Sequence, residues 1–279
     1  WRIEQHWSRY QPGNIVDRIN TADGRSIVVD DETARFLDYA AQLWTLSDGL
    51  FDVTSGVLRR VFRFDGSDRL PSADAVEALL PLVGWEKAFW QSPRLTLLPG
   101  MEIDFGGIGK EYAVDRGCAL AAGASGLPVL LNCGGDLAAS APRAGGQPWL
   151  VGVESQGIAA AASVIALSRG GIASSGDAHR YLLKDGVRYP HVLDPRSGWP
   201  VVGGPSVVTV VAGSCTEAGV LSTLALLHGA DAQGFLDGYE ADARLIALDA
   251  RTGAQVWDHE IALSAPATSR RPSRCAIAT

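Results

Sequence analysis

Two tight turns in the second half of the chain limit the folds that the sequence can adopt. Asp185-Gly186 lies inside the apolar stretch at residues 181–193, and Thr252-Gly253 lies inside a similar stretch at residues 244–257. Two-residue turns of this composition join antiparallel strands, because a parallel connection needs a crossover of a dozen or more residues. The sequence therefore predicts antiparallel hairpins in this half of the chain.

Helical periodicity marks four other segments. Apolar residues recur at three- and four-residue spacing after Asp30, after Ser72, from residue 111 to residue 122, and after Thr216. The segment after Ser72 is expected to stay helical through Val83, because Gly84 is its first stop signal. The remaining apolar segments have the length of strands: residues 129–132, 149–154, 163–167 and 207–211. Helices and strands mix without βαβ regularity, so the predicted class is α+β, with mixed, largely antiparallel sheets.

Length and composition indicate one compact unit. The 279 residues are 47% hydrophobic, enough for a sizeable core, and no Pro/Ser-rich or charged linker divides them. We expect a single domain over residues 1–263 and a frayed tail over residues 264–279. The chain starts at Trp1, inside a predicted helix, so we also expect a preceding segment, which is where a signal peptide or lipid anchor would lie.

The charge balance excludes one class of partner. The 24 basic and 31 acidic residues give a net charge of −7, and no Lys/Arg cluster is interleaved with aromatic residues, so nucleic acid is not expected to bind. No apolar run approaches the ~20 residues of a membrane-spanning helix, and none is predicted.

Glycine and small polar residues gather at four places. Each is expected to follow a strand, where loops can surround a ligand, although the same residues also make ordinary turns. The four clusters are Asp104-Phe-Gly-Gly-Ile-Gly-Lys110, Asn132-Cys-Gly-Gly-Asp136, Ser174-Ser-Gly-Asp177 and His191-Val-Leu-Asp-Pro-Arg-Ser-Gly198.

The cluster from Asp104 to Lys110 has the chemistry of a phosphate-binding loop. Its glycines allow close approach of the backbone, Lys110 supplies a cation, and the helix expected to follow presents free amide groups. It is not a Walker A loop, because only two residues separate Gly106 from Gly109, and the chain has no GxGxxG fingerprint.

Other catalytic constellations are weak. His191 could lie at the rim of a site or be an ordinary structural histidine, and Asp52 and Asp104 could form a carboxylate pair. The histidines and cysteines lack zinc-ligand spacing, so a metal here is expected to be a hard cation held by oxygens and by the phosphates of a ligand. No GxSxG motif supports covalent hydrolase chemistry.

Taken in order, these motifs resemble the ApbE family, the FAD:protein FMN transferases. The matching stretches are residues 8–11, 17–20, 48–54, 103–115, 131–136, 172–177, 191–198 and 207–211. The resemblance implies a bilobed α+β fold with FAD in a cleft. It also implies Mg²⁺-dependent transfer of FMN from FAD to a threonine or serine hydroxyl of a partner flavoprotein, with AMP leaving; some members are more like FAD pyrophosphatases.

The resemblance also implies roles for individual residues. His191 and Lys110 match catalytic positions, His191 as a base or phosphate partner. Positions that match cofactor contacts are Asn20, Leu50, Phe51, Asp52, Asp104, Gly106, Gly107, Lys110 and Val201. Gly107, through its carbonyl, together with Thr216 and Thr223, matches the metal site.

Two positions depart from the family pattern. The family has Asp-Ala-Leu-x-Thr, with a metal-binding Asp, where this chain has Gly219-Val-Leu-Ser-Thr223. Glu217 is about 200° away around the helix and cannot simply replace that carboxylate. Glu111 stands where the family usually has glycine. A second interpretation is therefore that the protein is an FAD-binding paralogue or an FAD pyrophosphatase with little or no transferase activity. Because the carboxylate is missing at position 219, we expect Gly219→Asp to raise the affinity for Mg²⁺.

The resemblance further implies an acceptor among membrane-associated redox subunits. An exported location follows from this, either periplasmic or anchored to the membrane through a preceding segment, with the cytoplasm as the alternative.

Overall fold

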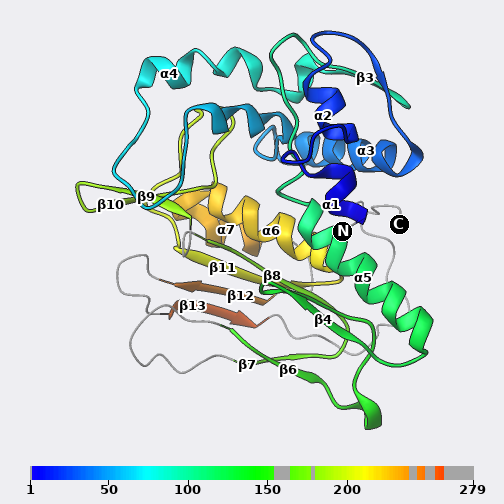
Figure 1. The fold of residues 1–279 in the computed structure, drawn as a ribbon. Helices are drawn as coiled ribbons and strands as arrows, with labels where there is room; N and C mark the ends of the chain where they lie inside the picture. The colour runs from blue at the N-terminus through cyan, green and yellow to red at the C-terminus, as the bar shows by residue number, and fades with distance from the viewer. Residues whose placement is uncertain (1, 154–163, 177–179, 239–243, 249–254, 261–279) are drawn as a thin grey trace.

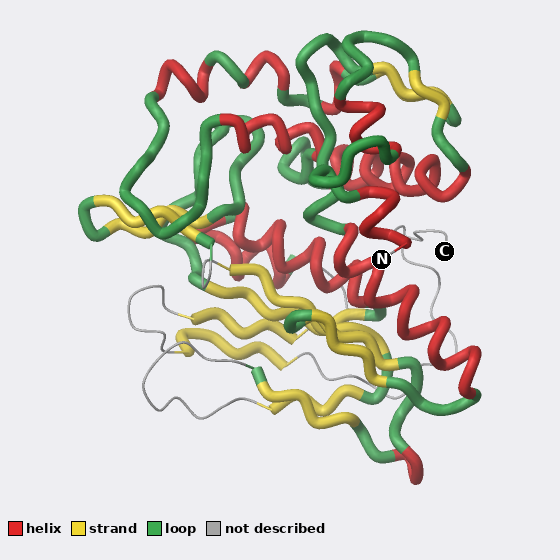
Figure 2. Tube along the Cα trace, viewed as in Figure 1, coloured by secondary structure: helices red, strands yellow, loops and turns green. Residues whose placement is uncertain are grey.

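The computed structural model describes residues 2–153, 164–176, 180–238, 244–248 and 255–260. Figure 1 shows a mainly helical layer, from the first half of the chain, stacked above a sheet formed by the second half, with helix α6 between them. Figure 2 shows the same division, with the helices of the upper layer in red and the strands of the sheet in yellow. The predicted tail at residues 264–279 lies outside the described residues.

The upper layer consists of short helices and one small sheet. Its antiparallel sheet has the strand order β1-β3-β2. The elements are α1 (Arg2–Trp7), α2 (Ile15–Asn20), β1 (Ile27–Val28), α3 (Asp31–Leu46), η1 (Val53–Arg60), α4 (Ala73–Glu77), η2 (Leu80–Leu82), η3 (Trp85–Lys87), β2 (Phe89–Gln91) and β3 (Arg94–Thr96).

The helix predicted after Asp30 is confirmed as α3, but the one predicted after Ser72 is too long. Asp30 caps α3 by accepting hydrogen bonds from the N–H groups of residues 32 and 33. Ser72 caps α4, yet α4 ends at Glu77 instead of continuing to Val83. Pro81 explains the difference, because its ring would collide with the carbonyl of Glu77 in a continuous helix. The chain continues instead as the short 3₁₀ helix η2.

The second half forms an antiparallel sheet of six strands, which confirms the predicted α+β class. Its order is β13-β12-β11-β8-β5-β4, and every neighbouring pair is antiparallel. The strands are β4 (Leu130–Cys133), β5 (Asp136–Ala139), β8 (Gly170–Gly176), β11 (Val207–Ala212), β12 (Arg244–Leu248) and β13 (Gln255–Glu260). Two separate hairpins pair β6 (Trp149–Gly152) with β7 (Val164–Leu167), and β9 (Tyr181–Lys184) with β10 (Val187–Pro190).

The two faces of the six-stranded sheet are covered differently. The helices on one face are α5 (Gly109–Ser125), α6 (Cys215–Leu227) and α7 (Ala232–Asp237), and the short 3₁₀ helices η4 (Ala144–Gly146) and η5 (Gly229–Asp231) lie in the connections. Val208 and Val210 of β11 face these helices, whereas Val211 packs with the apolar residues of the β6–β7 hairpin on the other face. The strand alternation thus assigns each side chain to one of two cores.

Helix α6 joins the two layers. Its Leu221 packs in the core against the sheet, whereas its Val220 and Leu224 belong to the core of the upper layer. The start of α6 lies so close to β8 that a Cβ atom on Gly171 would overlap the backbone nitrogen of Cys215. Because α6 is buried on both sides, it fixes the position of one layer relative to the other.

Within the described ranges, no helix combines the length and the apolar character that crossing a bilayer requires.

Candidate active site

A cleft of about 1170 Å³ lies where the two layers meet. Segments from both layers line it, and each of the four glycine clusters contributes residues to the lining. The predicted site residues among its lining are Leu50, Phe51, Asp52, Asp104, Gly106, Gly107, Lys110, His191 and Thr223. Residues separated by up to 173 positions in the sequence, Leu50 and Thr223, thus reach the same cavity.

The loop before α5 is held in a defined shape by its own acidic residue. The Asp104 carboxylate accepts a hydrogen bond from Gly106 N–H at 2.9 Å and forms an ion pair with Arg9 at 2.6 Å. A Cβ on Gly107 would lie 3.2 Å from the ring of Phe51, so glycine lets this aromatic ring pack against the loop. Arg9 was not predicted as a site residue, although residues 8–11 carry part of the family resemblance.

Asp52 has a structural task beside the cleft. Its carboxylate caps η1, accepting hydrogen bonds from the N–H and hydroxyl of Thr54, both at 2.7 Å, and from Trp85 N–H at 2.9 Å. Burial raises the pKa of Asp52 although these hydrogen bonds oppose the shift. Asp52 and Asp104 both line the cleft, but each carboxylate has its own partners, and no hydrogen bond between the two carboxylates is found among the described residues.

The first turn of α5 brings charged groups together at the cleft. The Lys110 ammonium forms an ion pair with Asp136 and lies 3.8 Å from Glu111 Oε1. Burial alone would lower the pKa of Lys110, but the hydrogen bond and the charge of Asp136 raise it. Asp136 is only 2% exposed. Asp136 belongs to one of the glycine clusters but was not predicted as a site residue, and its contact with Lys110 becomes visible only in the fold.

Glu111 is the least expected member of this group. It is 8% exposed, lines the cleft, and its Oε2 has no hydrogen-bond partner among the described residues. Burial raises its pKa to about 7, with the negative charges of Asp136 and Asp115 adding to the shift and Lys110 opposing it. A second carboxyl group, which is only partly ionised near pH 7, therefore stands beside Lys110.

His191 follows β10 and is neutral at pH 7. Burial, and then the positive charges of Arg180 and Lys110, lower the pKa of His191 to about 4. Its Nδ1 atom is buried and has no hydrogen-bond partner in the described part of the chain. A neutral imidazole in a cleft with cations can accept a proton from a reacting group.

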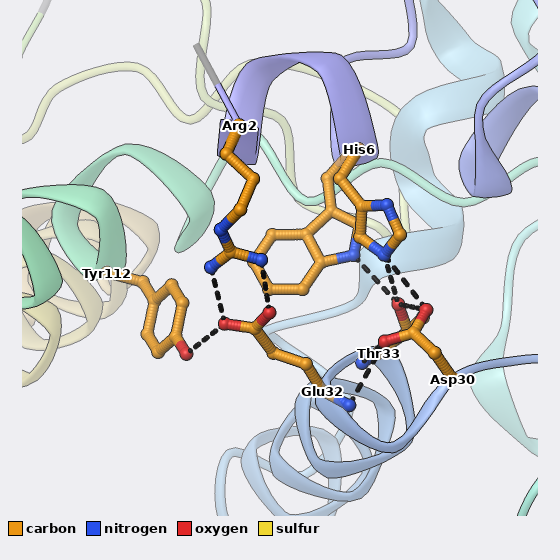
Figure 3. A network of polar contacts seen from close by, with 7 residues as sticks. Arg2, His6, Asp30, Glu32, Thr33 and Tyr112 are labelled. Carbon is orange, nitrogen blue, oxygen red and sulfur yellow. Dashed lines mark hydrogen bonds and ion pairs between the residues drawn. The ribbon is translucent and has the colours of Figure 1, made fainter.

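The N-terminal helix is fastened to α3 and α5 near the site. Figure 3 shows Arg2 bound to Glu32, with the closest atoms 2.6 Å apart, and the hydroxyl of Tyr112 donating to the same carboxylate at 2.8 Å. On the other side, His6 contacts Asp30 at 2.9 Å. Because Tyr112 follows Glu111 directly, this network restrains the turn of α5 that carries the charged group at the cleft.

Comparison with known proteins accounts for this arrangement. The model of the ApbE family matches residues 1–245. The chain belongs to the ApbE family. Curated relatives include the "FAD:protein FMN transferase" of Haemophilus influenzae, 27% identical over 82% of this chain and 70% of that protein, and that of Chlamydia pneumoniae, 31% identical over 80% and 70%. Among solved structures, the ApbE protein of Thermotoga maritima is 31% identical and has a TM-score of 0.80; the match covers 88% of this chain and 82% of that one. The flavinyl transferase ApbE of Pseudomonas stutzeri is 28% identical and has a TM-score of 0.79; the match covers 90% of this chain and 80% of that one.

Three residues expected to bind in this ApbE protein are not part of the cleft lining. The Thr216 hydroxyl donates to Asp115 at 2.7 Å, as part of the capping of α6, and its expected metal contact stays a prediction. Asn20 exchanges two hydrogen bonds with the backbone of Ile103, at 2.7 and 3.0 Å, and so positions the segment before the Asp104 loop. Val201 packs against the upper core.

The residues present fit a hard cation only in part. Within the described residues, no group of three or more His, Cys, Asp or Glu side chains is placed to hold a metal. The Thr223 hydroxyl lines the cleft and lies 3.1 Å from the Ser175 hydroxyl. The unpartnered Glu111 Oε2 supplies the oxygen ligand and negative charge that Mg²⁺ prefers. A cation would therefore need oxygens from the ligand to complete its shell.

Proposed function

We propose that this protein transfers FMN from FAD to a threonine or serine hydroxyl of a protein acceptor and releases AMP. The observation that carries the proposal is the convergence of Lys110, neutral His191 and the glycine-rich Asp104 loop on one large cleft. The relatives named FAD:protein FMN transferases support the same assignment.

Positive groups at the cleft match a pyrophosphate. Although the net charge is −7, several basic side chains line this cavity: Arg9, Arg59, Arg63, Lys110 and Arg180. Backbone amides at the start of α5 add partial positive charge. Five acidic side chains line the same cavity, and ion pairs with Arg9, Arg63 and Lys110 offset the charge of three of them: Asp52, Asp65, Asp104, Glu111 and Asp136. The support for a pyrophosphate site is therefore the placement of these basic groups and amides and not an excess of positive charge.

The proposed reaction is a phosphoryl transfer. The acceptor hydroxyl attacks the phosphorus on the FMN side of the FAD pyrophosphate, the bridging P–O bond breaks, and AMP takes the bond electrons as a phosphate oxygen. We assign His191 to accept the hydroxyl proton. Its pKa of about 4 makes it a weak base in the free protein. A bound pyrophosphate would offset the charges of Arg180 and Lys110, which contribute to that low value, and so raise the pKa.

Mg²⁺ fits this proposal as the group that neutralises charge on the pyrophosphate oxygens. Candidate protein ligands are the Thr223 hydroxyl, the Gly107 carbonyl and an acidic side chain at the cleft. The acceptor is proposed to be a membrane-associated redox subunit, and the place of reaction to be outside the cytoplasm; both rest on the family resemblance.

The test combines two readouts on the purified protein. FAD and a threonine-containing acceptor protein are added with and without Mg²⁺, and AMP release and flavin fluorescence on the acceptor are measured. We expect both to appear together and to require Mg²⁺. AMP without a flavinylated acceptor would indicate an FAD pyrophosphatase, and FAD binding without AMP would indicate a binding paralogue; either result would overturn the transferase proposal.

Variants test the residue roles. His191→Gln and Lys110→Met are each expected to slow FMN transfer by about 100-fold or more, as for loss of a general base or a charge stabiliser. The matched control is His228→Gln, because His228 stacks on Phe235 and does not line the cleft. Equal rates for His191→Gln and His228→Gln would contradict the assigned role.

A further inference from the structure

The two departures from the family pattern, Glu111 and Gly219, lie against each other. A Cβ atom on Gly219 would be 2.5 Å from Glu111 Cγ, 3.0 Å from Cδ and 3.4 Å from Oε1. The Glu111 side chain therefore occupies the space into which a side chain at position 219 of α6 would project. Any residue larger than glycine at position 219 would displace the Glu111 carboxylate.

The Glu111 carboxylate is placed like a ligand. It lines the cleft, its Oε2 is buried without a hydrogen-bond partner among described residues, and the Lys110 ammonium is already paired with Asp136. Leaving a buried carboxylate oxygen without a partner is costly, so a cation or a strong donor is expected to meet it when the cleft is filled.

The neighbouring hydroxyl lies on the same side of α6. Thr223 is four residues after Gly219, and residues at this spacing lie on one helix face about 5–6 Å apart. The Thr223 hydroxyl lines the same cleft. An acidic oxygen from α5 and a hydroxyl oxygen from α6 thus approach the cavity from adjacent helices.

We propose that Glu111 is the carboxylate ligand of a hard divalent cation in this protein, reaching from α5 into the space that Gly219 leaves open on α6. The inference rests on the proposed use of Mg²⁺. The family pattern places the metal-binding carboxylate on α6, at position 219, whereas in this chain it would come from Glu111 on α5. Glycine is required at position 219 because it leaves room for the Glu111 side chain.

This changes the expectation for Gly219→Asp. An Asp introduced alone would collide with Glu111 and place a second carboxylate beside a buried one. Gain of Mg²⁺ affinity is therefore expected only when Glu111 is replaced by glycine in the same chain.

Cation binding can be measured without turnover. Mn²⁺, a hard divalent probe, is titrated into the FAD-loaded protein in the absence of acceptor, and the free Mn²⁺ signal is followed by electron paramagnetic resonance. Glu111→Gln is expected to weaken Mn²⁺ binding about 10-fold or more, by loss of ligand charge. The double variant Glu111→Gly with Gly219→Asp is expected to bind within about 3-fold of the wild type. Glu217→Gln is the matched control, because Glu217 is on α6 but does not line the cleft.

The outcomes separate this inference from the proposed function. Unchanged Mn²⁺ affinity in Glu111→Gln, no Mn²⁺ binding by the wild type, or no recovery in the double variant would each overturn the ligand assignment. Thermal melting and FAD fluorescence without metal confirm that each variant is folded. If the wild type binds Mn²⁺ through Glu111 but releases no AMP and flavinylates no acceptor, the transferase proposal fails and the cation site stands.

Discussion

The contact between Glu111 and Gly219 predicts that one substitution changes stability differently in two backgrounds. Alanine at position 219, in the middle of α6, gains about 1 kcal/mol in helix propensity over glycine. In the wild type its Cβ would lie 2.5 Å from Glu111 Cγ, and overpacking of this kind costs about 1–3 kcal/mol. Gly219→Ala should therefore be neutral or destabilising by up to about 2 kcal/mol.

Removing the Glu111 side chain changes the expected effect. In a Glu111→Ala background the Cγ and Cδ atoms are gone, so Gly219→Ala should stabilise the protein by about 1 kcal/mol. The coupling energy between the two positions is then about 1–3 kcal/mol. These four proteins form a double-mutant cycle. The effect of Glu111→Ala itself is present in both proteins of that background, so it cancels when the two effects of Gly219→Ala are compared.

Urea unfolding followed by circular dichroism measures all four proteins. The free energies are compared from the midpoints at a common slope, because a changed slope would signal a change in the denatured state. If Gly219→Ala has the same effect in both backgrounds to within about 0.5 kcal/mol, the two sites are independent and the geometry inferred for Glu111 is wrong.

Three further substitutions test other parts of the structure. Gly171→Ala would push a Cβ into the backbone at the start of α6, so we expect loss of folded protein or a cost above about 3 kcal/mol; an unchanged thermal melt would contradict the close packing of α6 on β8. Asn20→Ala removes both hydrogen bonds to the segment before the Asp104 loop and should cost about 1–3 kcal/mol in urea unfolding, with weaker FAD binding; full stability would show that those bonds contribute little. The hydrogen bond from Arg2, aided by that from Tyr112, lowers the pKa of Glu32 to about 2 from 4.5, so its contribution is present above about pH 4.5 and lost as the pH falls towards 2. Glu32→Gln should lower stability at pH 7 by less than about 1 kcal/mol, because the pair is near the surface, and should flatten the acid dependence; an identical pH profile would refute this.

The sequence predicted correctly those helices and strands that depend on residues close together in the chain. The Asp30 cap and the apolar spacing after it gave α3, and the Asp185-Gly186 turn gave the β9–β10 hairpin. The segment after Ser72 was predicted too long because the apolar period was followed to Gly84 and Pro81 was overlooked. Ser174 was predicted at the end of a strand but lies within β8, which continues to Gly176. Strand limits depend on pairing with β11, and a linear pattern does not contain that partner.

The candidate site was predicted only as far as single motifs allow. The resemblance identified Lys110, His191 and Thr223, which the fold brings to one cleft. It could not show that Thr216 is committed to Asp115, because that contact joins residues 101 positions apart. The same limit applies to Glu111 and Gly219, which appeared in the sequence as two separate departures and are one contact in the structure.

The most direct test of the transferase account is the stoichiometry of its products. The protein is incubated with FAD, Mg²⁺ and an acceptor protein, intact-mass spectrometry counts FMN groups on threonine or serine of the acceptor, and chromatography counts AMP. The account predicts one AMP for each FMN attached, with both lost in His191→Gln. AMP accumulating without an FMN adduct, or no AMP at all from a protein that binds FAD, would contradict it.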